Sequence, residues 1–132
     1  MPFVRFQSLW LVFLVLSACS QSEANKADEQ VRAALSWAAT AAMTLDAWRN
    51  GTVPSHYARR TSRTARENIL ELINNLEHSG LRGPVQDKMR QMGETLGEAE
   101  TGVALLDQAA VQRGRDALAA TASSLRASTR SP

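Results

Sequence analysis

The sequence predicts an all-α protein: an antiparallel up-down bundle of four helices, the last of them short. Alanine, leucine, glutamine, glutamate and arginine dominate the chain and β-branched residues are few, a composition that favours helices. After about residue 27, apolar residues recur at steps of three and four positions, the spacing of one helix face. Glycine and proline interrupt this pattern and leave only short connections, and helices joined by short turns lie antiparallel to their neighbours.

The first helix is predicted over about residues 23–50. Asn50 and Gly51 would end it, because glycine readily takes the left-handed conformation that terminates helices. Residues 52–54 then form a short turn. The apolar stripe of this helix consists of Val31, Leu35, Ala38, Ala42, Leu45 and Trp48.

The second helix is predicted from Ser55, which is a suitable capping residue, to about residue 79, where Gly80 stops it. One face of this helix is mostly apolar and is expected to point inward. Its members are Ala58, Ser62, Ala65, Ile69, Leu72, Ile73 and Leu76.

The third helix is predicted to begin at Pro84, which suits a first helical position because its missing N–H has no partner there anyway. Gly93, Gly97 and Gly102 weaken this helix and mark either close contact with another helix or a local break. Gly114 is the predicted stop. A heptad seam that alternates steps of four and three runs along the helix through Val85, Met89, Met92, Leu96, Ala99, Val103, Leu106 and Ala110.

The fourth helix is predicted to be short, capped by Asp116, with Leu118, Ala122 and Leu125 facing inward. If Gly114 does not break the third helix, a three-helix bundle is the alternative. The bundle domain would span residues 28–127, followed by a frayed tail over residues 128–132.

The first nineteen residues differ in kind from the rest of the chain. Eight apolar residues run without a break over positions 9–16, too few for a membrane span of about 20 residues but typical of a secretory signal. Leu16, Ser17, Ala18 and Cys19 follow. This tetrapeptide resembles the lipobox of bacterial lipoproteins, a resemblance that covers residues 1–19 only. The alternatives are an ordinary signal peptide with an incidental cysteine, or an uncleaved anchor.

The lipoprotein resemblance implies that residues 1–18 are removed and that Cys19 carries acyl chains such as palmitate, which bind the protein to a membrane of the bacterial envelope. Ser20 would follow the lipidated cysteine and favours the outer membrane, facing the periplasm, with the inner membrane as the alternative. Residues 19–27 are predicted to be a short polar tether. Its eight residues after Cys19 would reach at most about 26–29 Å when fully extended. Cys19 is the only cysteine, so the domain can form no internal disulfide.

The charge balance does not favour a nucleic-acid partner. Arg5 is the only charged residue before Cys19, so the 15 basic residues fall to 14 against 13 acidic ones once the signal is removed. Nucleic-acid-binding domains are usually strongly basic.

A basic stripe on the second helix is the best candidate for a binding surface. Arg59, Arg63 and Arg66 fall at i, i+4 and i+7, with Arg60 beside them. The stripe could meet anionic lipid headgroups, cell-wall material or an acidic protein. The alternative is a solvated face whose arginines pair with Glu67, Glu71 or acids of a neighbouring helix.

Aromatic and methionine residues offer a second candidate. Trp37 and Trp48 lie almost three helical turns apart, and with Tyr57 they are the only aromatic residues after Cys19. They could line a ligand pocket or anchor a partner, but they could equally fill an alanine-rich core. Three methionines (Met43, Met89 and Met92) invite a similar hypothesis, with ordinary core packing as the alternative.

No motif for catalysis, a metal or a cofactor is found in the sequence. His56 and His78 are 22 residues apart on one predicted helix, about 33 Å at 1.5 Å per residue, and cannot share a metal ion. His78 instead suits a helix end. The chain contains no nucleophile elbow or phosphate loop. We therefore expect a non-catalytic protein-interaction or accessory module that is held close to the membrane and has an unidentified envelope protein as its partner. The heptad seam could also serve a homo-oligomer. The alternative is a small-ligand- or client-binding bundle that uses the Trp- and Met-lined core.

Overall fold

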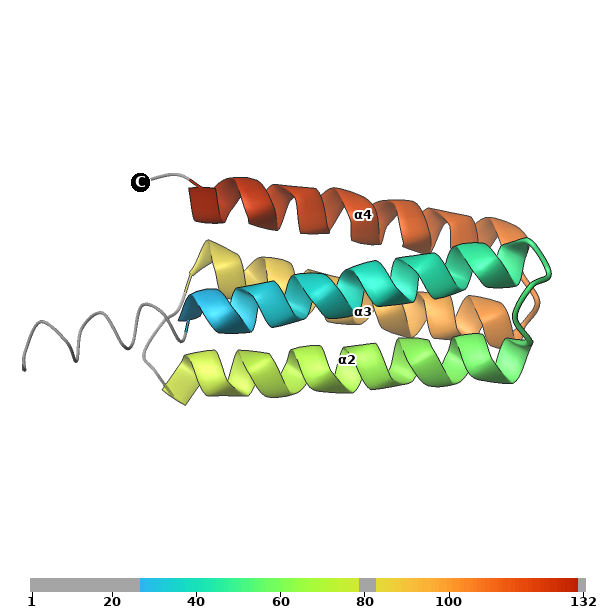
Figure 1. Cartoon of the computed structure of the whole chain (residues 1–132), viewed down its shortest axis with the longest axis horizontal. Helices are drawn as coiled ribbons and strands as arrows, with labels where there is room; N and C mark the ends of the chain where they lie inside the picture. The colour runs from blue at the N-terminus through green and yellow to red at the C-terminus, as the bar shows by residue number, and fades with distance from the viewer. Residues whose placement is uncertain (1–26, 79–82, 131–132) are drawn as a thin grey trace, which may run out of the picture.

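The computed structural model describes residues 27–78 and 83–130, and within them it is a bundle of four helices with no strand (Figure 1). A first helix over residues 27–49 precedes α2 (Ser55–His78), α3 (Pro84–Ala104) and α4 (Gln108–Arg130). The all-α prediction is confirmed, as is the bundle. The signal peptide, Cys19 and the tether up to residue 26 lie outside the described residues.

The two ends of the bundle are distinct. One end of the bundle, which we call the near end, lies at the left in Figure 1. It contains the start of the first helix, the end of α2, the start of α3 and the end of α4. The connection over residues 50–54 and the turn between α3 and α4 lie at the right, at what we call the far end. The first helix alone, 23 residues at 1.5 Å each, separates the two ends by about 35 Å.

The first helix ends as its sequence predicts. Gly51 has a φ of 77°, and its N–H donates to the Trp48 carbonyl at 3.0 Å. The Thr52 N–H donates to the Ala47 carbonyl at 2.8 Å. These two bonds form a Schellman motif, in which the left-handed residue is usually glycine.

Ser55 does not cap α2 as predicted. It is the first residue of the helix, and its hydroxyl oxygen accepts a hydrogen bond from the Trp48 indole at 2.9 Å. The amides of Tyr57 and Ala58 donate to the Pro54 carbonyl instead. Ser55 therefore joins α2 to the first helix.

The predicted boundary between the third and fourth helices is wrong. α3 ends at Ala104, ten residues before Gly114, and α4 is as long as its neighbours. The Leu106 N–H donates to the Val103 carbonyl at 3.1 Å, and the Asp107 N–H donates to the Gly102 carbonyl at 2.8 Å. This is a second Schellman motif, but here Leu106, with a φ of 56°, takes the position that glycine usually fills.

Asp107, and not Asp116, caps α4. Its carboxylate accepts a hydrogen bond from the Ala110 N–H at 3.0 Å, and its carbonyl accepts one from the Val111 N–H at 3.1 Å. Asp116 lies in the interior of α4, which continues through the predicted frayed segment as far as Arg130. The heptad seam is buried from Met89 to Val103 and then fails, because Leu106 is exposed in the turn and Ala110 belongs to α4.

Two glycines allow α3 and α4 to approach closely. A Cβ at Gly102 would stand 3.0 Å from a methyl group of Val111, and a Cβ at Gly114 would stand 3.3 Å from the Cβ of Ala99. The interpretation of Gly102 as a contact position is confirmed. Gly114, predicted to end a helix, is a second such position.

The core consists of two clusters. The larger one extends from the near end along the bundle and contains Val31, Ala34, Ala38, Ala41, Ala65, Ile69, Ile73, Leu76, Met89, Met92, Leu96, Leu118, Ala122 and Leu125. The smaller one lies at the far end and contains Leu45, Trp48, Ala58, Ala99, Val103 and Val111. The predicted inward face of α2 is buried, with Leu72 partly so, as are Leu118, Ala122 and Leu125 of α4.

Shortening Leu96 should destabilise the bundle, because this side chain is fully buried in the larger cluster. We expect Leu96→Ala to lower the free energy of unfolding by about 2–5 kcal/mol. Leu105→Ala removes the same atoms from a side chain that is 73% exposed and should change it by less than about 0.5 kcal/mol. Equal denaturation midpoints for the two variants would contradict the assignment of the core.

Candidate binding surface

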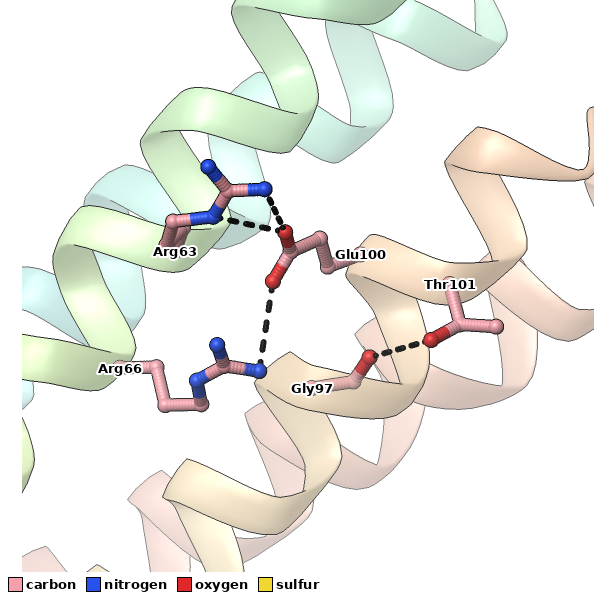
Figure 2. A network of polar contacts seen from close by, with 5 residues as sticks. All are labelled: Arg63, Arg66, Gly97, Glu100 and Thr101. Atoms are coloured by element: carbon pink, nitrogen blue, oxygen red, sulfur yellow. Dashed lines mark hydrogen bonds and ion pairs between the residues drawn. The ribbon is translucent and has the colours of Figure 1, made fainter.

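The basic stripe of α2 is divided by a single acid of α3. The Glu100 side chain is only 12% exposed, and it contacts two arginines of the stripe (Figure 2). Arg63 donates from Nε at 2.9 Å and from Nη2 at 2.7 Å, both to Oε1. Arg66 Nη1 lies 3.3 Å from Oε2. Both oxygens of one carboxylate are therefore occupied by guanidinium groups.

The backbone of α3 makes room for this network. A Cβ at Gly97 would stand 3.0 Å from Arg66 Nη1, so glycine leaves space for the arginine beside α3. One turn later, the Thr101 hydroxyl donates to the Gly97 carbonyl at 3.1 Å, which satisfies the side chain within its own helix (Figure 2). Gly97 is thus a contact position between α2 and α3.

The other half of the stripe is not neutralised. Among the residues that the structure describes, no hydrogen bond or ion pair joins the side chains of His56, Arg59 or Arg60 to another residue. These three residues and Arg63 line a shallow, open hollow at the far end, which we call the cationic hollow. Sequence reasoning grouped the four arginines together and left out His56.

Large apolar side chains are exposed at the same end of the bundle. Leu105 is 73% exposed, Leu106 is 68% exposed and Tyr57 is 51% exposed. Ala58 follows Tyr57 and packs in the smaller cluster with Val103, which precedes the turn that carries the two leucines. We call Tyr57, Leu105 and Leu106 the apolar tip. Sequence reasoning missed Leu105 altogether and assigned Leu106 to the core.

The two tryptophans do not form a joint site. Trp48 is buried in the smaller cluster, where its indole donates to Ser55, whereas the partly buried Trp37 packs against the larger cluster. Tyr57 belongs to the exposed apolar tip. Met89 and Met92 are fully buried in the larger cluster, and Met43 is 73% exposed on the first helix.

A pocket at the near end is lined by other residues. Its apolar lining includes Val31, Leu76 and Val85, with Gln86 and Ser128 as polar members. His78 lies at this end, and its Nδ1 donates to the Asn74 carbonyl at 2.7 Å, within the last turn of α2. His56 and His78 lie at opposite ends of α2, and no group of metal-binding side chains is found in the described ranges.

Comparisons of the chain with protein-family descriptions, with curated proteins and with solved structures find no match. Within the described residues, no helix has both the length and the apolar character needed to cross a membrane.

Removing the charge of Glu100 should destabilise the contact between α2 and α3. Glu100→Gln leaves Arg63 and Arg66 without an anionic partner, and we expect a loss of about 1–3 kcal/mol in the free energy of unfolding. Glu98→Gln on the exposed face of α3 is the matched control and should change it by less than about 0.5 kcal/mol. A double-mutant cycle with Arg63→Gln measures the coupling, and a coupling energy near zero would contradict the network.

Proposed function

We propose that this protein is a non-catalytic envelope lipoprotein that binds a partner protein at the far end of its bundle. The observation that carries this proposal is that the exposed apolar tip and the cationic hollow lie at the same end of the bundle, since exposed apolar groups near charged ones are typical of partner surfaces. A nucleic-acid partner is not part of the proposal, because the chain carries little net charge.

The bundle is proposed to follow an up-down-up-down order. The short connections support this order, as does the alternation of the chain between near and far ends in Figure 1. In this order the first helix begins at the near end, and the apolar tip lies about 35 Å further along the bundle from the start of that helix. The proposed location is the periplasmic face of the outer membrane, with the inner membrane as the alternative.

The conformation of Leu106 supports a role in binding. A left-handed backbone costs a non-glycine residue about 1–2 kcal/mol, and such residues persist at functional sites. In the first helix, Gly51 fills the equivalent position of the same motif without this cost. Because the Leu106 side chain is exposed, core packing explains little of its presence.

Acylation at Cys19 is the first test of the proposal. Cells that express the full chain should incorporate labelled fatty acid into the protein, and Cys19→Ser should abolish the label, because the chain has no other cysteine. If the serine variant is labelled as strongly as the natural chain, the lipoprotein interpretation is wrong.

Partner capture tests the apolar tip. We expect crosslinking in the native envelope to trap a specific protein, and the double variant Leu105→Ser, Leu106→Gly to lose at least about nine-tenths of it, as expected for anchors that contribute about 2 kcal/mol. The glycine relieves the left-handed strain, so this variant keeps its fold.

Met43→Ser is the matched control, because Met43 is as exposed as Leu105 but lies on the first helix. Capture that is lost equally in the Met43 variant, or retained in the tip variant, would refute the apolar tip as the partner surface. Melting curves of both variants check that the bundle is intact.

A further inference from the structure

Three of the four residues that line the cationic hollow, His56, Arg59 and Arg60, have no ion-pair partner among the described residues. From Pro54 to Arg66 the chain contains His56 and four arginines but no acid. Among the described residues, Glu100 pairs with Arg63 and Arg66, and α2 has no acid in its first turn. The first turn of α2 therefore offers no carboxylate to offset either the helix dipole or the arginines that follow it.

Glu100 also fixes the orientation of Arg63, one of the residues that line the cationic hollow. Both bonds from Arg63 to Glu100 use its Nε and Nη2 atoms, and Figure 2 shows the remaining amino group of this guanidinium directed away from the carboxylate. Arg63 therefore enters the hollow with its plane already fixed, which lowers the conformational entropy lost when an anion binds. Arg59 and Arg60 keep all their donors available to the same anion.

We propose that the cationic hollow binds a phosphate group through Arg59, Arg60 and Arg63. A carboxylate is planar, carries one charge and is matched by a single guanidinium fork. A phosphate group offers at least two anionic oxygens directed tetrahedrally, which suits donors that converge from several side chains. The inference rests on the proposed function, since the phosphate would mark the partner or surface held at the far end.

Two sources could supply this phosphate: a soluble phosphorylated molecule or a lipid headgroup. The near end follows the tether, and the residues of the cationic hollow lie about 22 Å (Arg63) to 33 Å (His56) from that end along α2, at 1.5 Å per residue. A headgroup of the anchoring membrane is therefore within reach only when the bundle lies along the membrane surface. The test separates these two sources.

The test uses the full acylated chain in neutral detergent micelles, with inorganic phosphate as the probe and chloride at matched ionic strength. Arginine side-chain NMR signals should shift and saturate. Arg59→Gln with Arg60→Gln should weaken binding at least about tenfold, equivalent to about 1.4 kcal/mol. The matched control, Arg32→Gln with Arg113→Gln, removes the same charge from exposed positions on other helices and should leave the affinity within about twofold.

A second arm measures flotation with phosphatidylcholine vesicles that contain or lack phosphatidic acid. Saturable phosphate binding without flotation assigns a soluble source, and flotation that requires both phosphatidic acid and the two arginines assigns a headgroup. The inference is overturned if neither arm shows saturable binding, or if the control double variant weakens binding as much as the hollow variant.

The tip variant separates this inference from the proposed function. Leu105→Ser with Leu106→Gly should keep full phosphate affinity while it loses partner capture. If the natural chain captures its partner but no arm detects phosphate, this inference fails and the proposed function stands. If phosphate binds but the natural chain captures no partner, the proposed function fails and the phosphate site stands.

Discussion

The turn between α3 and α4 determines the second half of the molecule. Its left-handed residue, Leu106, closes a Schellman motif, and Asp107 immediately caps the next helix. Only three residues join α3 to α4, and Gly102 and Gly114 allow the two helices to approach closely. Val111 of α4 thereby completes the smaller cluster. The same geometry places Leu105 and Leu106 in solvent. Close helix packing and the exposed apolar tip are therefore two results of one turn.

This turn also shows which features the sequence could predict. The inward faces of α2 and α3 followed from spacing alone, because burial of an apolar stripe is the dominant constraint on an amphipathic helix. The end of the first helix followed from Gly51, whose backbone freedom is visible in the sequence. The end of α3 was missed because a leucine occupies the glycine position and continues the heptad spacing by coincidence. A cap preference at Asp107 was the one signal that could have revealed it.

The sequence predicted the basic residues of the candidate site, but not the acid that pairs with two of them. Spacing placed four arginines along α2, and it could not show that Glu100 of α3 would reach two of them, since the register between helices depends on tertiary packing. His56 lines the cationic hollow because it lies one turn before Arg59 and Arg60 on the same helix. Likewise the helical spacing of Trp37 and Trp48 suggested one shared face, but the clusters against which they pack differ.

Two features that lower the stability of the fold lie at the far end. A left-handed leucine costs about 1–2 kcal/mol, and the first turn of α2 lacks an acid, which forgoes about 0.3–1 kcal/mol of stabilisation by the helix dipole. Together they are an appreciable part of the 5–15 kcal/mol that stabilises a typical domain. Glycine at position 106 and an acid in the first turn of α2 would remove both costs without disturbing the core. The described residues of the near end show no comparable destabilising feature. There Glu77 accepts hydrogen bonds from Gln86 and Arg90. Because both costs lie at the same end of the bundle as the exposed apolar residues, they support the proposed binding role of the far end.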